Sequence, residues 1–291
     1  MTAAGGHQAS GNRSGSRDAS ALFGAVAAAY ARHRLTYPAR FFELLLQHLP
    51  ADPLVWDCGC GSGQASLDLA ERGVRVIATD ASAAQLAAAG AHPRIVYRYA
   101  AADASGLAAA SVDGVVAAAA VHWFAGEAFN AEVRRVSKPG AVLAWIGYLP
   151  LLLPDSRLQQ VMDGFHTGTL APWWPAERRW VEQSYAGLAF PAEEWAFPQG
   201  LWIERRWNLT ALLTHIGTWS AVQRCREAGG DPLPGLAAAL APLWPGQGDE
   251  PLLVRWPFMG RWGAVRPAGP RSPQPAAAAP PPGPPHPAGH S

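Results

Sequence analysis

The 291-residue chain has few charged side chains, few cysteines and no long apolar run. Asp, Glu, Lys and Arg make up 15% of it, against about 25% in ordinary soluble proteins. Lys and Arg (23) nearly balance Asp and Glu (22), which argues against a nucleic-acid reader that works by bulk positive charge. Three cysteines exclude a disulfide scaffold and favour a reducing compartment, so we expect a cytoplasmic protein. Because no run of roughly 18 apolar residues occurs, we expect no contact with a membrane through a spanning helix.

Two terminal segments differ in composition from the rest of the chain. Residues 1–20 are rich in Gly, Ser and Ala, and residues 267–291 hold ten prolines and no acidic residue. Neither segment can bury enough apolar surface to offset chain entropy, so we expect a disordered N-terminal extension and a disordered Pro/Ala-rich tail. The function is therefore sought between residues 21 and 266.

Short apolar runs alternate with helical patterns in the first half of the chain. Strands are predicted at residues 54–57, 74–79, 95–99, 112–119 and 141–146. Helices are predicted from Pro38 to Leu49 and at residues 64–72, 82–89 and 126–137. Continuous apolar strands separated by helices predict an α/β fold with a doubly wound, mostly parallel sheet. In such a sheet, ligands bind beyond the carboxyl ends of the strands, where the strand order reverses.

The turn after the first predicted strand holds Gly59, Gly61 and Gly63. Glycines let the backbone approach a ligand closely, and the helix that follows favours negative charge at its N-terminus. A dinucleotide-binding fingerprint needs its third glycine at position 64, which is Gln64. Asp80 ends the second predicted strand 21 residues after Gly59 (80 − 59), where a carboxylate can accept both hydroxyls of a ribose. Together these residues predict a ligand that contains a nucleoside.

Four motifs follow one another between residues 55 and 147. They are V-W-D-C-G-C-G-S-G at residues 55–63, Asp80-Ala81-Ser82, Ala102-Asp103-Ala104 and V-S-K-P-G-A at residues 136–141. In this order they resemble the motifs of the class I S-adenosylmethionine (SAM)-dependent methyltransferases. The resemblance implies a Rossmann-like sheet of the class I methyltransferase type, with SAM as the cofactor.

Further segments resemble one branch of that family, methyltransferase type 11, which includes the trans-aconitate methyltransferases. They are Y-A-R-H-R-L-T-Y-P at residues 30–38, His122-Trp123-Phe124, T-W-S-A-V at residues 218–222 and R-W-P-F at residues 255–258. The resemblance thus covers residues 21–266 as one methyltransferase domain. It implies a SAM-binding core at about 50–148 and a substrate or cap region at about 150–266. Leu35 and Ala141 depart from the family pattern, which has Pro and Gly there.

The resemblance implies eight cofactor-binding residues, namely Asp57, Gly59, Gly61, Gly63, Asp80, Ala81, Asp103 and Ala104. Asp80 is expected at the ribose and Asp103 at the adenine amino group. Asp57 either orients the glycine turn or binds the ammonium of the methionine moiety through water. We expect no metal, because the cofactor already carries an activated carbon and the cysteines lack zinc-ligand spacing.

On the acceptor side the resemblance implies five catalytic candidates, namely His122, Trp123, Tyr30, Arg34 and Tyr37. His122 either acts as a general base or fixes its own loop. Trp123 either lines the pocket or belongs to the core. Arg34 either binds a carboxylate of the acceptor or lies in solvent.

Ten of the 13 tryptophans lie between Trp173 and Trp262. This density predicts a Trp-rich helical insertion or cap after the fifth strand, or a packed extra layer. The leading interpretation is a SAM-dependent methyltransferase that acts on a small-molecule acceptor, with carboxylic acids as one acceptor class, and that has no nucleic-acid or membrane partner. The alternatives are a catalytically inactive SAM-binding module and an NAD(P)-dependent oxidoreductase. The sequence leaves the acceptor and the oligomeric state open.

Overall fold

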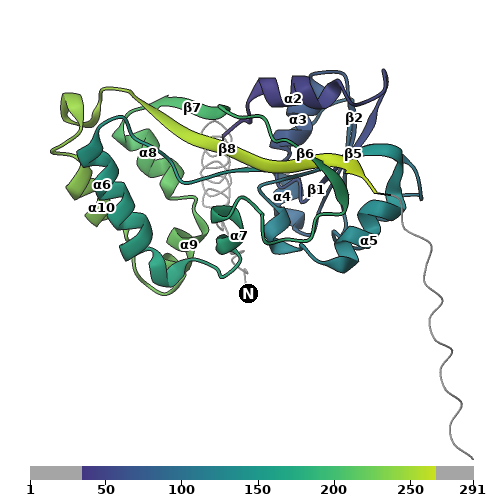
Figure 1. Ribbon diagram of the computed structural model, residues 1–291. Coiled ribbons are helices and arrows are strands. Elements are labelled where there is room, and N and C mark those ends of the chain that lie inside the picture. The colour runs from purple at the N-terminus through teal and green to yellow at the C-terminus, as the bar shows by residue number, and fades with distance from the viewer. Residues whose placement is uncertain (1–34, 267–291) are drawn as a thin grey trace, which may run out of the picture.

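The computed structural model describes residues 35–266 of the chain. The predicted extension at 1–20, the predicted tail at 267–291 and two predicted site residues, Tyr30 and Arg34, lie outside the described residues. Eight strands form a sheet in the order β3-β2-β1-β4-β5-β8-β6, and β7 also pairs with β8. Figure 1 shows how the helices surround this sheet.

The first five strands along the chain are the ones that the sequence predicts. They run parallel to one another and comprise β1 (Leu54–Cys58), β2 (Arg75–Asp80), β3 (Ile95–Tyr99), β4 (Val112–Ala118) and β5 (Ser137–Tyr148). β1 lies between β2 and β4, so the strand order reverses at β1 and β4. A ligand crevice is expected beyond the carboxyl ends of these two strands. The predicted doubly wound, mostly parallel α/β sheet is confirmed.

Helices cover both faces of the parallel strands. They are α2 (Ala39–Leu46), α3 (Gln64–Ala70), α4 (Ala83–Ala87) and α5 (Glu127–Val136). Neighbouring residues of β1 point to opposite faces, so Val55 packs into the core under α2 and α3 and Trp56 into the core under α5. Phe41 of α2 and Phe129 of α5 are both almost fully buried in these two cores. Apolar residues on both faces of β1 are therefore needed to hold the helices in place.

The second half of the chain contains helices, in the region where the sequence predicted a helical insertion or cap, and three strands that the sequence did not predict. Its elements are α6 (Ser156–Gly164), η2 (Phe165–Thr169), η3 (Ala171–Trp173), α7 (Arg178–Glu182), β6 (Ala192–Trp195), β7 (Trp202–Trp207), α8 (Leu209–Ile216), α9 (Ser220–Glu227), α10 (Leu233–Leu240), η4 (Pro245–Gly248) and β8 (Leu252–Val265). In Figure 1, α6, α8, α9 and α10 gather on one side of the molecule and β1 to β5 on the other, and the long strand β8 runs across both.

β8 joins the two halves because it pairs antiparallel with three strands. Its residues 252–257 pair with β7, and residues 258–264 pair with β5. β6 lies on the other side of its last residues. A side chain at Gly263 would place Cβ 1.9 Å from the carbonyl oxygen of Glu193, so glycine is required where β8 passes so close to β6.

Four tryptophans of the second half pack β8 onto its neighbours β6 and β7. The rings of Trp207 and Trp256 lie 5.3 Å apart, and those of Trp195 and Trp262 lie 5.2 Å apart. Trp174, Trp219 and Trp256 also line the cavity described below. No helix within residues 35–266 is long and apolar enough to cross a membrane.

Candidate active site

A cavity of about 1730 Å³ opens at the carboxyl ends of the parallel strands. It begins at the glycine turn after β1 and at Asp80, passes His122, and ends among Trp174 and Trp219 in the second half of the chain. It therefore lies where the reversal of the strand order predicts a ligand site. Several residues predicted from the sequence line its wall, namely Tyr37, Gly59, Gly61, Asp80, Ala81, Asp103, His122 and Trp123.

The glycine turn between β1 and α3 forms the floor of one end of the cavity. Gly59, Gly61 and Gly63 have φ angles of 69°, 56° and 86°, in the left-handed region that favours glycine. A Cβ on Gly59 would lie 2.7 Å from Cβ of Ala120, so a side chain there would push β1 and the loop after β4 apart. The amide of Gly59 donates to the carbonyl of Thr79 at 2.8 Å, which ties the turn to β2. The turn can thus present bare backbone to a ligand.

Asp80 ends β2 with both carboxylate oxygens held by backbone amides. Oδ2 accepts a hydrogen bond from the amide of Gly61 at 2.8 Å, and Oδ1 accepts one from the amide of Ser82 at 2.8 Å. Each oxygen keeps a second acceptor position, and the side chain lines the cavity. The carboxylate is therefore held at the cavity wall with room to accept two further hydroxyl groups.

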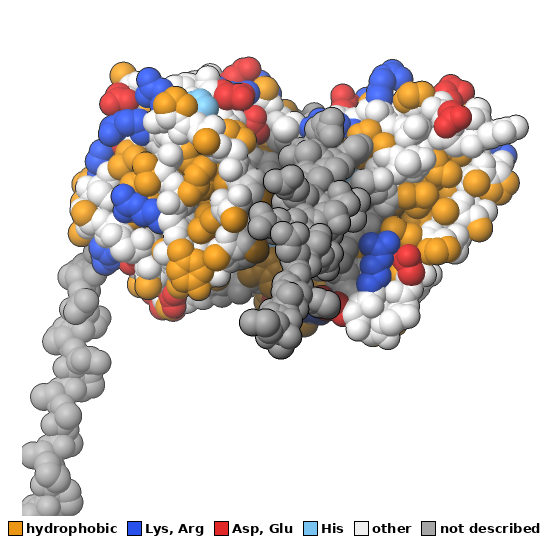
Figure 2. All heavy atoms as spheres, turned by 180° about the vertical axis from the view of Figure 1, so that it is seen from behind, with side chains coloured by type: hydrophobic (Ala, Val, Ile, Leu, Met, Phe, Trp, Pro, Cys, Tyr) orange, Lys and Arg blue, Asp and Glu red, His pale blue; other side chains and the backbone are white. Residues whose placement is uncertain are grey.

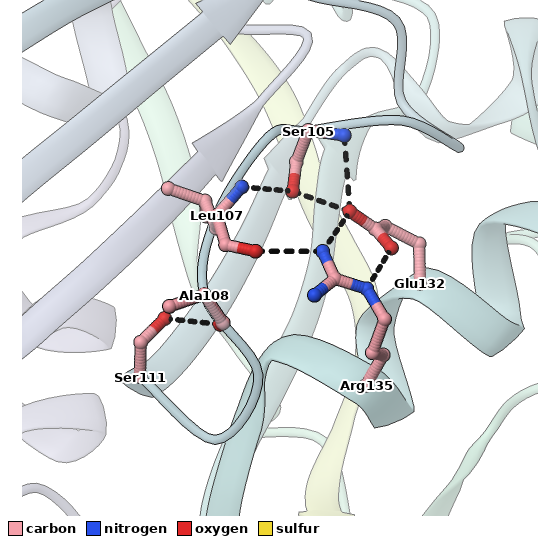
Figure 3. A network of polar contacts seen from close by, with 6 residues as sticks. All are labelled: Ser105, Leu107, Ala108, Ser111, Glu132 and Arg135. Atoms are coloured by element: carbon pink, nitrogen blue, oxygen red, sulfur yellow. Dashed lines mark hydrogen bonds and ion pairs between the residues drawn. The ribbon is translucent and has the colours of Figure 1, made fainter.

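Asp103 lies in a tight turn. Figure 3 shows the contacts that tie the segment just after it, at Ser105 and Leu107, to α5. Ala101 and Ala104 form a bridge at the base of this turn, and Asp103 lines the cavity. Oε1 of Glu132 accepts hydrogen bonds from the amide of Ser105 at 3.0 Å and from its hydroxyl at 2.5 Å. Sequence reasoning missed Glu132, because an acid within a helix gives no signal that it reaches a loop 27 residues away.

Arg135 completes the same network from the next turn of α5. Its Nη2 donates to the carbonyl of Leu107 at 2.7 Å, and its Nε donates to Oε2 of Glu132 at 2.6 Å. The hydrogen bond from Arg135 is the main reason that the pKa of Glu132 is lowered from 4.5. Glu132 and Arg135 are therefore positioning residues for the loop that carries Asp103.

Three predicted cofactor residues do not line the cavity, namely Asp57, Gly63 and Ala104. Asp57 is fully buried beneath the glycine turn, where its Oδ2 accepts a hydrogen bond from the hydroxyl of Ser66 at 2.5 Å. Its Oδ1 has no hydrogen-bond partner within residues 35–266. Burial raises the pKa of Asp57 from 3.8 to about 6. Of the two roles that the sequence left open for Asp57, this position favours orienting the turn.

His122 lies in the short helix η1 (Val121–Trp123) directly after β4 and faces the cavity. Its ring lies parallel to that of Tyr185 at a centroid distance of 6.5 Å. Nδ1 is buried without a hydrogen-bond partner in the described part of the chain. Burial and, to a smaller extent, the positive charge of Arg178 lower the pKa of His122 from 6.5 to about 4. The imidazole is therefore neutral at neutral pH.

The other two described candidates on the acceptor side also reach the cavity. Trp123 lines it but is 52% exposed, so it lies at the wall and not in the core. Tyr37 lines it from the segment before α2, and its ring lies 6.2 Å from that of Phe258 in β8. The segment before α2 thus packs against β8 next to the cofactor end of the cavity, so the beginning and the end of the described chain meet there.

Sequence reasoning missed four residues of the same wall, namely Tyr148, Trp174, Arg178 and Tyr185. The pattern of residues 172–185 predicted only a loop and helix insertion. Their place in the site depends on α7, which packs against η1 and brings Arg178 close to His122. Within residues 35–266, no group of His, Cys, Asp or Glu side chains is arranged to hold a metal ion.

Comparisons with known proteins show that the chain is similar to methyltransferases. Residues 56–145 match the family described as a methyltransferase domain. A solved structure from Anaeromyxobacter dehalogenans, a candidate type II methyltransferase, is 46% identical and superposes with a TM-score of 0.73, covering 80% of this chain and 99% of that one. This chain belongs to the class I SAM-dependent methyltransferases. The narrower likeness to the trans-aconitate methyltransferases stays a prediction.

Two further relatives agree with this assignment. A methyltransferase of Dictyostelium discoideum is 26% identical over 222 residues, which cover 75% of this chain and 84% of that protein. A Mycobacterium tuberculosis methyltransferase is 36% identical over 131 residues, which cover 45% of this methyltransferase and 53% of the relative.

The residues at the cofactor end of this methyltransferase fit SAM. The turn of left-handed glycines presents backbone without side chains, and the fixed carboxylate of Asp80 keeps acceptor positions for ribose hydroxyls. Asp103 offers a second carboxylate further along the same wall. These residues would hold the cofactor, which supplies a methyl carbon activated by its sulfonium.

Proposed function

We propose that this methyltransferase transfers the methyl group of SAM to a small-molecule acceptor, and that carboxylic acids are its acceptor class. The observation that carries the proposal is one continuous cavity that runs from Asp80 and Asp103 past His122 to Arg178 and Trp219. A cofactor bound at the aspartates and an acceptor bound near the tryptophans would share this space beside His122. Alignment of the two reactants accounts for much of the catalysis of such a displacement.

A small molecule is favoured over a nucleic acid by the surface. On the face that Figure 2 shows, Lys and Arg side chains are interspersed with acidic and apolar ones and do not form one basic face. Non-specific nucleic-acid binding depends on clustered positive charge. The acceptor is therefore expected inside the cavity.

The low pKa of His122, about 4, bears on which acceptor the site can use. An efficient general base has a pKa near the working pH, and this imidazole is a weaker base than that. A carboxylate acceptor needs no base. One of its oxygens forms the new bond to the methyl carbon while the carbon–sulfur bond breaks and leaves its electron pair on sulfur, so that the positive and negative charges cancel and an ester forms. His122 then acts as a neutral hydrogen-bond partner that positions the acceptor.

The first experiment tests the cofactor on the full chain. We expect micromolar binding of S-adenosylhomocysteine in calorimetric titration, no binding of NADH, and loss of binding in Asp80→Ala. Asp52→Ala is the matched control, because this exposed acid pairs with Arg75 at the opposite end of β2. Absence of S-adenosylhomocysteine binding would overturn the proposal.

Turnover is tested next with SAM and a panel of small acids, by following formation of S-adenosylhomocysteine. We expect methyl esters from at least one acid. Cofactor binding without turnover of any acid would favour the catalytically inactive SAM-binding module instead.

A further inference from the structure

Arg178 is a cation at the acceptor end of the cavity, and its hydrogen-bonding capacity is only partly used. Its side chain is 22% exposed and lines the cavity. Nε lies 3.5 Å from Oε1 of Glu182 but makes no hydrogen bond, and Nη2 donates to Nε2 of His166 at 3.3 Å. The contacts of Arg178 with Glu182 and His166 thus use Nε and Nη2. A guanidinium has five N–H donors, so this one retains donors for a ligand.

The guanidinium is held in place by an aromatic frame. Cζ of Arg178 lies 4.6 Å from the centre of the Trp174 ring, within the range of a cation–π contact. Nε1 of Trp174 donates to the carbonyl of His166 at 3.0 Å, and the rings of Trp174 and Trp219 lie 5.8 Å apart. Because these contacts fix the guanidinium before a ligand arrives, little side-chain freedom is lost on binding.

The protonation of His166 suits this arrangement. Burial lowers the pKa of His166, and the charge of Arg178 lowers it further, so its ring stays neutral and accepts the hydrogen bond from Nη2. Burial also lowers the pKa of Arg178, but a guanidinium is so strong a base that it stays charged at neutral pH. The cavity therefore holds a permanent positive charge that has been partly removed from water.

The charges around the cavity are separated by sign. Of the described residues that line it, the acids are Asp80 and Asp103 at the cofactor end, and the arginines are Arg178 and Arg226. Arg226 already pairs with Asp231 at 3.3 Å. Glu182 forms an ion pair with Arg178 at 3.5 Å without a hydrogen bond, and its own side chain is 48% exposed. A bound anion would accept hydrogen bonds from the N–H groups that Arg178 retains for a ligand.

The wall beside Arg178 is formed by the ring of Trp174, which contacts the ring of Trp219. Leu213 of α8 and Leu233 of α10 add apolar surface to the cavity, and polar side chains such as Thr214 line it as well. The rings next to Arg178 favour an apolar or aromatic body over a sugar or a polar chain.

We propose that Arg178 determines the specificity of the acceptor site by binding the carboxylate of an apolar monocarboxylic acid, whose body lies against Trp174, Trp219 and Leu213. The inference rests on the proposed function and names the group that recognises its substrate. Nη1 binds one carboxylate oxygen and leaves the other oxygen free for methyl transfer. The neutral ester no longer forms an ion pair with Arg178, which favours its release.

The test is calorimetric titration of the full chain saturated with S-adenosylhomocysteine. The probes are 4-phenylbutanoate and octanoate, each compared with its primary amide, which has the same body without the charge. We expect each acid to bind at least tenfold more tightly than its amide. Arg178→Met, which removes the charge and keeps much of the apolar volume, should abolish this preference, and Arg178→Lys should retain part of it.

Arg226→Met is the matched control, because Arg226 lines the same cavity but is already paired. It should keep the preference for the acids, and all variants should keep the affinity for S-adenosylhomocysteine, which reports on the fold. Equal binding of acid and amide, no binding of either acid, or an unchanged preference in Arg178→Met would overturn the inference and leave the cofactor assignment intact. Loss of S-adenosylhomocysteine binding by the unaltered protein would instead overturn the proposed function itself.

Discussion

Replacement of Glu132 by Gln should weaken cofactor binding, although Glu132 does not line the cavity. The carboxylate of Glu132 is buried, with 7% of the residue exposed, and it accepts hydrogen bonds from Ser105 and Arg135. Glutamine has the same shape but no charge, and it turns one acceptor into a donor that faces the guanidinium of Arg135. The contacts of Ser105 and Leu107 with α5 (Figure 3) are then weakened, and with them the support of the preceding turn that carries Asp103.

The magnitude follows from the contacts that are lost. Hydrogen bonds to charged groups contribute about 1.5–3 kcal/mol each, and Gln keeps those from Ser105, so we expect a loss of about 2–3 kcal/mol in the free energy of unfolding. In a domain of this size that corresponds to a melting temperature lower by about 4–12 °C. If re-ordering the loop when the cofactor binds costs about 1 kcal/mol, the Kd for S-adenosylhomocysteine rises about fivefold.

The assay combines thermal unfolding with calorimetric titration of S-adenosylhomocysteine. Glu127→Gln is the matched control on the same helix, because Glu127 forms an exposed ion pair with Arg134 that is worth little. It should change neither the melting temperature nor the Kd.

The difference in stability between the unaltered protein and Glu132→Gln should depend on pH. The pKa of Glu132 is lowered from 4.5 in the folded protein, so its stabilising contribution is present above pH 4.5 and is lost as the pH falls through the lower folded value. The gap between the unaltered protein and Glu132→Gln should therefore close in acid. An unaltered Kd together with an unaltered melting temperature would show that α5 does not hold the Asp103 loop.

Two further predictions concern buried titratable groups. The pKa of Asp57 in the folded protein, about 6, lies above its ordinary value of 3.8. The contribution of Asp57 to the free energy of unfolding is therefore greatest below pH 3.8 and is lost as the pH rises through 6. The total loss is on the order of 3 kcal/mol. Urea unfolding of Asp57→Asn should lack this loss, and equal pH dependence in both proteins would contradict it. Because the pKa of His122 is about 4, kcat/KM for an acid acceptor should show no inflection between pH 5.5 and 8. The activity of His122→Gln should stay within tenfold of that of the unaltered protein. A drop of 10² or more would make His122 a general base.

The positions of β1 to β5 along the chain, the glycine turn and the position of Asp80 could be predicted from the sequence because their signals are local. An apolar run such as Leu54–Cys58 followed by glycines specifies a strand and a turn within about ten residues. Asp80 follows a strand of the same kind. Parallel strands place their carboxyl ends at one edge, so the cofactor end of the cavity follows from topology alone.

The acceptor end depended on contacts between segments far apart in the chain. β8 was missed because Pro257, Gly260 and Gly263 interrupt its apolar pattern, yet its pairing with β5 and β6 makes glycine necessary. Periodicity carries no information on which segments pair across such separations. The approach of α7 to η1, which sets Arg178 near His122, was likewise decided by tertiary packing, because burial and charge at that point arise only when the two halves of the chain meet.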